Sequence, residues 1–202
     1  DPKRLVSLDD FNKSIIADSI LEISMSGYTI GNKTLYDDLH SLKAGELVIF
    51  QENDYKYIQY YKYFGEIKNA DYSDFLKELS QVTINVFKKM LSQVGDRQII
   101  VPLSAGNDSR LVVSVLSYLG AKNVKCYSYG SSNNFEANIA KKIAQKLKYE
   151  WIFLPLTHKG EKKFYKSTEY GCYLEFSETY SSVPYIQGLS TIKYLKEINW
   201  ID

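Results

Sequence analysis

The stretch that decides the fold is residues 99–109, which read IIVPLSAGNDS. An apolar run gives way here to small and polar residues, and an amphipathic segment follows over residues 110–119. That order predicts a strand, a tight turn and the start of a helix. A helix start offers unpaired backbone N–H groups and the positive end of the helix dipole, so it attracts phosphate. The sequence therefore predicts a phosphate-binding turn between a strand and a helix.

The side chains of this turn favour an anion together with a metal ion. Small residues let the backbone approach a ligand closely, and the hydroxyls of Ser104 and Ser109 add hydrogen-bond donors. The Asp108 carboxylate repels phosphate by itself, but it fits the turn if it holds a metal ion that bridges the phosphates. The plainer alternative is an ordinary turn whose helix is capped by Asn107, Asp108 or Ser109.

Composition limits the class of protein. The chain has 202 residues, of which 45% are hydrophobic, and a net charge of +1. It can hold one domain or two small ones, and its charge predicts neither nucleic-acid nor membrane binding. Cys126 and Cys172 stand alone and the only histidines are His40 and His158, so we expect no structural zinc site. Single cysteines and the absence of a membrane-length apolar run favour the cytoplasm.

The first sixty-odd residues predict a small helix-plus-hairpin region. Its expected parts are a helix over residues 8–25, a glycine-punctuated loop over 27–36, a turn over 43–46, and strands over 47–50 and 56–63 that flank a hairpin turn at 52–54. This region is too small to bury a core well.

From about residue 71 onward, strands alternate with helices. The expected elements are helices over 74–91, 110–119 and 135–147, and strands over 98–103, 124–129 and 151–154. This alternation predicts an α/β fold with a parallel sheet, and ligands sit at the carboxyl ends of such strands. The tail is expected to add helices over 162–174 and 189–198, a loop over 176–187 and the beginning of a fourth strand at 199–202.

Residues 104–109 resemble the PP-loop of the ATP pyrophosphatases, Ser-Gly-Gly-x-Asp-Ser, more than a Walker A loop, because no Gly-Lys-Ser/Thr ends the turn. The departure is Ala105, which stands where that family has its first glycine. A methyl group at this position is compatible with phosphate binding if φ is negative, and is not if φ must be positive.

The chain as a whole is similar to the glutamine-hydrolysing asparagine synthetases. The matching pieces are residues 31–36 and 42–45, which resemble the end of the glutaminase domain, and residues 103–109, 127–130 and 135–147, which follow the synthetase domain in order. The resemblance implies two domains. Residues 1–68 would be the C-terminal remnant of an N-terminal-nucleophile glutaminase-like domain. Residues 69–202 would be the N-terminal part of an ATP-binding synthetase domain with an adenine nucleotide alpha-hydrolase-like fold.

The same resemblance implies the site residues and the reaction. The pyrophosphate of ATP would bind at Ser104, Ala105, Gly106, Asp108 and Ser109, with Mg²⁺ at Asp108 and backbone contacts to adenine from Leu103 and Tyr129. No catalytic side chain is assigned. ATP would activate an acceptor carboxylate such as aspartate as an acyl-adenylate, which ammonia derived from glutamine then attacks. The implied partners are these small molecules, with no nucleic acid or membrane and no indication of the oligomeric state.

Two nearby residues each leave two interpretations open. Arg110 is either a cation beside the phosphates or a solvated helix residue. Glu136 matches an acidic position of the family, but Asn133-x-x-Glu136 is also a capping-box pattern, which we favour.

The family's N-terminal cysteine and its later acidic glycine motif do not occur in the sequence, which begins at Asp1. We therefore expect a fragment that is inactive by itself. Two other functions fit the sequence less well. One is another PP-loop adenylating ligase, of NAD synthetase-like, tRNA-modifying or β-lactam-forming type. The other is a non-catalytic nucleotide-binding module.

Overall fold

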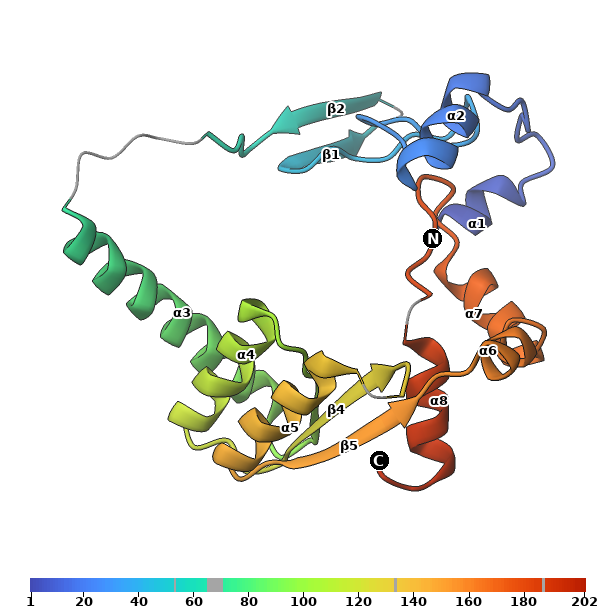
Figure 1. The fold of residues 1–202 in the computed structure, drawn as a ribbon. Coiled ribbons are helices and arrows are strands. Elements are labelled where there is room, and N and C mark those ends of the chain that lie inside the picture. The colour runs from blue at the N-terminus through green and yellow to red at the C-terminus, as the bar shows by residue number, and fades with distance from the viewer. Residues whose placement is uncertain (53, 65–70, 133, 187) are drawn as a thin grey trace. The chain divides into compact units, whose positions relative to one another are not determined.

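The computed structural model describes residues 1–52, 54–64, 71–132, 134–186 and 188–202. The chain divides into two compact units. The first unit comprises Asp1–Ile67 with Lys166–Ile186, and the second comprises Lys68–Tyr165 with Gln187–Asp202 (Figure 1). The boundary expected between residues 68 and 69 lies outside the described residues. The structure groups residues 166–186 with the first unit. The sequence predicted two consecutive domains and did not predict that this later segment returns to the first.

The second unit is built on a parallel sheet. Its strands and connecting helices are β3 (Ile99–Pro102), α4 (Asn107–Tyr118), β4 (Val124–Gly130), α5 (Phe135–Lys146) and β5 (Glu150–Pro155). The strand order is β3-β4-β5 and both pairings are parallel, with Val101 opposite Cys126 and Cys126 opposite Trp151. The predicted α/β class and parallel sheet are confirmed, and each of these elements lies within a few residues of its predicted range.

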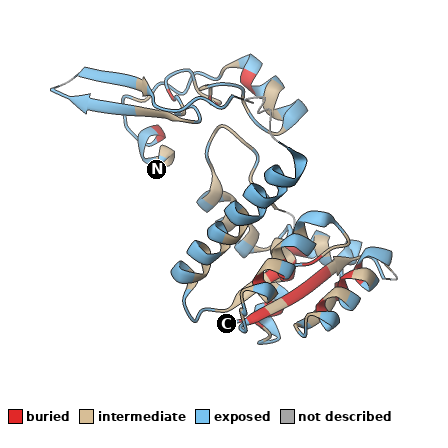
Figure 2. Ribbon diagram, turned by 90° about the vertical axis from the view of Figure 1, so that its left-hand side faces the viewer, coloured by how far each residue is buried: buried red, intermediate tan, exposed pale blue. Residues whose placement is uncertain are grey.

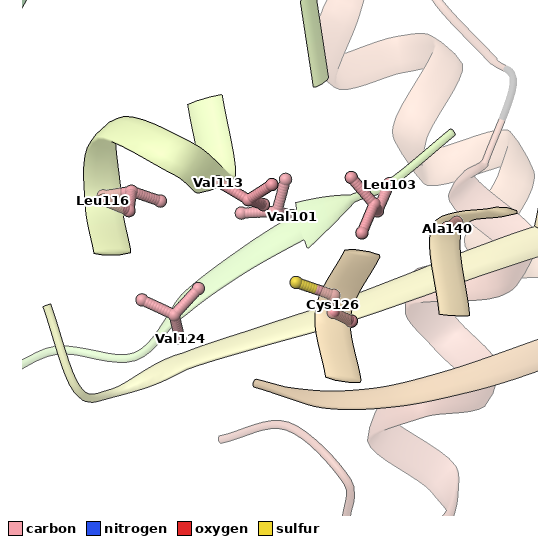
Figure 3. Close-up of a cluster of buried hydrophobic side chains, with 8 residues drawn as sticks. Val101, Leu103, Val113, Leu116, Val124, Cys126 and Ala140 are labelled. Atoms are coloured by element: carbon pink, nitrogen blue, oxygen red, sulfur yellow. The ribbon is translucent and has the colours of Figure 1, made fainter. Parts of the chain in front are cut away.

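One face of this sheet carries a buried hydrophobic cluster, shown in Figure 3. Its buried members are Val101, Leu103, Val113, Leu116, Val124, Cys126, Ala140 and Ala144. Strands β3 and β4 supply one side of the cluster, and α4 and α5 supply the other. The C-terminal half of α3 (Tyr72–Val94) adds Phe87, Met90 and Leu91 to its edge. Burial raises the pKa of the Cys126 thiol to about 11, so this cysteine is the inert core residue that the sequence predicts.

The opposite face of the sheet packs against α8 (Leu189–Glu197). Tyr127 and Leu154 from the strands form a second cluster with Leu195 and Ile201. Successive strand residues face opposite sides of a sheet, so Cys126 and its neighbour Tyr127 belong to different clusters. The sheet therefore lies between α4 and α5 on one face and α8 on the other. Figure 2 shows that buried residues gather along the sheet.

The single helix predicted over residues 162–174 is wrong. The structure has two helices here, α6 (His158–Phe164) in the second unit and α7 (Thr168–Ser177) in the first. Ser167 caps the second helix, since its side chain accepts a hydrogen bond from the backbone N–H of Tyr170 at 3.3 Å. A serine cap favours a new helix start over continuation of the old one.

The fourth strand predicted at residues 199–202 is also wrong. Asn199 adopts a left-handed conformation with φ of 53°, and the backbone N–H of Trp200 donates to the carbonyl of Leu195 at 2.9 Å. The segment is therefore a turn that ends α8. Ile201, whose apolar character suggested a strand, is buried against the sheet instead.

The first unit is composed of short elements. They are α1 (Pro2–Val6), α2 (Ala17–Ser26), β1 (Glu46–Gln51), β2 (Asp54–Gln59) and α7. The antiparallel β1–β2 hairpin is confirmed, with Glu46 opposite Gln59, while Asn53 of its expected turn lies outside the described residues. The single helix predicted over residues 8–25 is wrong, because α2 begins only at Ala17 and Ile15, before it, forms a β-bridge with Tyr36.

Hydrogen bonds, more than buried apolar side chains, connect the first unit. Its buried residues among those described are Val6, Ser19, Thr34 and Leu39. The Thr34 hydroxyl donates to the carbonyl of Leu39 at 2.7 Å and accepts from the N–H of Tyr36 at 3.1 Å. The backbone N–H of Leu35 donates to the carbonyl of Tyr180 at 2.6 Å, which ties residues 166–186 to this unit.

Across the described parts of the chain, every helix is too short or too polar to cross a bilayer.

Candidate functional site

A cavity of about 330 Å³ opens at the carboxyl ends of β3 and β4 in the second unit. Its lining residues are Pro102, Leu103, Ser104, Tyr127, Ser128, Tyr129, Asn134, Glu136 and Ala137. Small-molecule sites commonly occupy about 300–1,000 Å³ and combine an apolar lining with a few polar groups. The position also matches the edge at which parallel sheets bind ligands.

Two loops border this cavity. The β3–α4 loop comprises residues 103–106 and the β4–α5 loop comprises residues 131–134, of which residue 133 lies outside the described residues. Because β3 and β4 are neighbouring parallel strands, the loops that follow them start side by side. The sequence predicted both loops at this edge, and the structure brings them to one cavity.

Two serine hydroxyls hold the β3–α4 loop together. The Ser109 hydroxyl accepts from the backbone N–H of Ser104 at 3.1 Å and lies 3.0 Å from the Ser104 hydroxyl. The Ser104 hydroxyl in turn accepts from the backbone N–H of Gly106 at 3.1 Å. These bonds fold the loop back on the first turn of α4, so its shape is set by its own residues.

The N-terminus of α4 has no side-chain cap. Its N-cap residue is Gly106, and the side chain of Ser109 bonds back into the loop. Within the described parts of the chain, no group accepts a hydrogen bond from the backbone N–H groups of Asn107, Asp108 or Ser109. The ordinary capped turn that the sequence left open therefore does not describe this helix start. These N–H groups, at the positive end of the helix dipole, can bind an anion.

Ala105 does not strain the loop. Among the described residues, the non-glycine ones with positive φ are Glu52, Lys148, Tyr180 and Asn199, so Ala105 meets the condition of a negative φ. Gly106 has φ of −67°, an ordinary value, but a Cβ added there would lie 3.1 Å from the Ser104 hydroxyl oxygen. A side chain at position 106 would therefore crowd the Ser104 hydroxyl, whereas the loop accommodates the methyl group of Ala105.

Asp108 lies in the first turn of α4 and is exposed. None of the described residues donates a hydrogen bond to its carboxylate. Mg²⁺ binds oxygen ligands, and in nucleotide sites it commonly takes one or two carboxylates plus substrate phosphates. A single carboxylate beside an anion-binding helix start therefore fits a Mg²⁺ ion that is shared with a bound nucleotide.

Arg110 makes its contacts within the same helix turn. Its Nε donates to the carbonyl of Gly106 at 3.3 Å, and its terminal nitrogen donates to the side-chain oxygen of Asn107. The residue is exposed, so both of the roles left open by the sequence remain compatible with its position.

The backbone of Leu103 is already engaged. Its N–H donates to the carbonyl of Tyr127 at 2.8 Å, and its carbonyl accepts from the hydroxyl of Ser128 at 2.6 Å. A carbonyl oxygen has two lone pairs and can accept a second bond, whereas the N–H has no further capacity. The predicted contact between Leu103 and a base is therefore restricted to the carbonyl.

Tyr129, whose backbone is expected to contact the base, also lines the cavity and is half-buried. Its ring stacks on that of Tyr127, with ring centroids 6.1 Å apart. Gly130 follows with φ of 136°, a conformation that L side chains rarely adopt, and a Cβ there would lie 3.0 Å from the amide nitrogen of Asn134. This glycine lets the β4–α5 loop turn tightly beside the cavity.

Asn134 is the residue that caps α5. Its side-chain oxygen accepts from the backbone N–H of Glu136 at 2.9 Å. The capping box expected from Asn133 involves a residue outside the described ones. Glu136 itself lines the cavity, and its side chain bonds to no group in the described parts of the chain.

Two contributors were missed at the level of sequence. Ser128 is buried at the centre of the site, where its hydroxyl donates to Leu103 and accepts from the indole N–H of Trp151 at 3.0 Å. The available signal was a small polar residue between two tyrosines in a strand. Asn134 was placed in the loop, although an asparagine directly before a helix is a common N-cap.

No family model matches the chain, and no curated protein sequence matches it. Among solved structures, the chain is similar to an NH3-dependent NAD synthetase from Campylobacter jejuni in complex with the nitrate ion. The two share 16% sequence identity and a TM-score of 0.37 over 46% of this chain and 41% of that enzyme, so the chain spans less than half of the enzyme's length.

Proposed function

We propose that the second unit holds the ATP site of a PP-loop adenylating ligase that forms amide bonds, of the asparagine-synthetase type. The observation that supports this most strongly is the uncapped start of α4, which follows a serine-bonded loop whose first residues, Leu103 and Ser104, line a cavity of about 330 Å³. An anionic group and a neighbouring organic group can thus bind together at one edge of the sheet.

The β3–α4 loop would hold the pyrophosphate part of ATP. The backbone N–H groups at the start of α4 donate to phosphate oxygens, and Ser104 and Ser109 present their hydroxyls beside them. Ala105 and Gly106 keep the loop small enough for close approach. Asp108 would hold Mg²⁺, which neutralises charge on the departing pyrophosphate.

The cavity would hold the nucleoside. The carbonyl of Leu103 can accept a bond from an exocyclic amino group, and Tyr129 lies at the end of the neighbouring strand. Backbone groups can form hydrogen bonds with the edge of adenine whatever their side chains are. Leu103 and Tyr129 could therefore both contact the base through their backbone.

The reaction that fits such a site is adenylation of an acceptor carboxylate, aspartate in the leading case, followed by attack of ammonia derived from glutamine. Stabilisation of charge on the leaving pyrophosphate needs no protein nucleophile. Residues 1–68 would then be the end of a glutaminase-like domain, and the reaction would take place in the cytoplasm.

Calorimetric titration of ATP with Mg²⁺ into the full chain tests the proposal. We expect the wild type to bind, and Asp108→Ala to bind about tenfold more weakly with Mg²⁺ present, a loss of roughly 1.4 kcal/mol. Asp96→Ala is the matched control, an exposed aspartate of the same unit that does not line the cavity. No binding by the wild type would overturn the proposal. Pyrophosphate release on addition of aspartate and ammonia would distinguish a ligase from a binding module.

A further inference from the structure

A carboxylate that has no role in the proposed ATP site lies at the cavity, just after the β4–α5 loop. Glu136 is one of the lining residues and is exposed. Its backbone N–H is held by the Asn134 cap at 2.9 Å, so the position of the residue is set without its side chain. The carboxylate is free to bind a ligand.

We propose that Glu136 accepts hydrogen bonds from the ribose hydroxyls of the bound nucleotide, an inference that rests on the proposed ATP site. A carboxylate only accepts hydrogen bonds, and its two oxygens match two neighbouring hydroxyl donors. Of the parts of a nucleotide, the sugar supplies such a pair of hydroxyls.

The arrangement of the cavity places the sugar near this residue. Ser104 lines the cavity at the β3–α4 loop, and Leu103 and Tyr129, where the base is proposed to bind, line it at the ends of β3 and β4. The sugar of a nucleotide lies between its phosphates and its base. Glu136 and Asn134 begin the helix that follows the neighbouring strand, and they are the polar lining groups that remain for the sugar.

The described residues do not place Glu136 in a metal-binding cluster of acidic side chains. In the described residues, no group of three or more histidine, cysteine, aspartate or glutamate side chains is placed to hold a metal ion. Asn134 adds to the sugar assignment. Its oxygen is committed to the cap, which leaves its amide nitrogen, close to Gly130, as a donor at the same edge.

The test compares ATP with 2′-deoxy-ATP and 3′-deoxy-ATP, each with Mg²⁺, by calorimetric titration of the full chain. We expect the wild type to bind ATP about tenfold more tightly than either deoxynucleotide, a difference of about 1.4 kcal/mol, because each deoxynucleotide lacks one hydroxyl that donates to the carboxylate. Glu136→Ala should bind all three alike, at the affinity of the wild type for the deoxynucleotides. Glu136→Gln keeps one acceptor oxygen and should restore part of the preference.

Glu161→Ala is the matched control. Glu161 occupies the first turn of α6, as Glu136 occupies the first turn of α5, but it lies outside the cavity lining. It should keep the full preference for ATP. If Glu136→Ala binds ATP and still prefers it tenfold, the ribose contact is overturned and the ATP site stands. If the wild type binds none of the three nucleotides, the ATP site itself is overturned, and the ribose contact with it.

Discussion

The two loops that border the cavity differ in the kind of group they present. The β3–α4 loop offers donors, since its helix begins without a cap and the N–H groups of residues 107–109 are free among the described residues. The β4–α5 loop offers an acceptor, because Asn134 caps its helix and leaves the Glu136 carboxylate at the cavity. We therefore propose that the same strand-turn-helix geometry provides an anion site in the first loop and a hydroxyl site in the second. The difference depends on whether the helix start is capped.

The two helices behind these loops are also held differently. Leu116 fixes α4 with a large side chain that is fully buried, whereas Ala140 and Ala144 let α5 approach the sheet closely. Substitutions in the core therefore test each loop through the helix that positions it.

Leu116→Ala should have the largest effect. Removal of a fully buried leucine side chain leaves a cavity, and the expected loss is about 2–5 kcal/mol of unfolding free energy. Urea denaturation followed by circular dichroism measures it. Leu111→Ala on the same helix is the control, because Leu111 is 53% exposed and should cost much less. Equal losses for the two variants would contradict the described packing of α4.

Ala140→Leu should come next. The alanine is fully buried between α5 and the sheet, so a larger side chain forces the helix away and costs about 1–3 kcal/mol. Asn138→Leu on the exposed side of the same helix should be nearly neutral. A stabilised Ala140→Leu variant would show that α5 does not lie close to the sheet.

Asn134→Ala should cost about 1 kcal/mol, the usual effect of removing an N-cap. The change also releases the first turn of α5, so the preference for ribonucleotides should fall together with stability. A variant with unchanged stability would contradict the stabilisation of α5 by an Asn134 cap that α4 lacks.

At neutral pH the ionisation of the buried Cys126 thiol should have the smallest effect, because its contribution to stability appears only at alkaline pH. The pKa of Cys126 is raised to about 11 from its ordinary value of 9.0, so the unfolded chain loses this proton first as pH rises. Stability is unaffected below pH 9 and falls between 9 and 11. Cys126→Ala should show a smaller fall in unfolding free energy between pH 8 and pH 11 than the wild type does. An identical fall would contradict the closed core around this thiol.

Much of the second unit could be predicted from the sequence, because its elements follow from local patterns. Apolar strand segments that alternate with amphipathic helices predicted the parallel sheet, and the small polar residues after Leu103 predicted the β3–α4 loop. The helix caps were harder to predict, because Asn134 and its neighbours include several residues with a similar tendency to occupy an N-cap position. Ser128 depends on a partner from another strand, which no local pattern reveals.

The first unit could be predicted less well for a physical reason. Residues 166–186 join it through backbone bonds such as those from Leu35 to Tyr180 and from Val183 to Gly27, which bring together distant parts of the sequence. Backbone hydrogen bonds of this kind leave no periodic signature. The hairpin was the exception, because antiparallel strands with a short connection are a local structure.

The central claim is that the free N–H groups at the start of α4 bind the phosphates of ATP. Amide NMR spectra of the ¹⁵N-labelled chain, titrated with pyrophosphate and then with ATP, each with Mg²⁺, test it directly. The account predicts that both ligands shift the resonances of Asn107, Asp108 and Ser109, and that ATP alone also shifts those of Tyr129 and Glu136. Saturating ATP that leaves the three α4 resonances unmoved would contradict it.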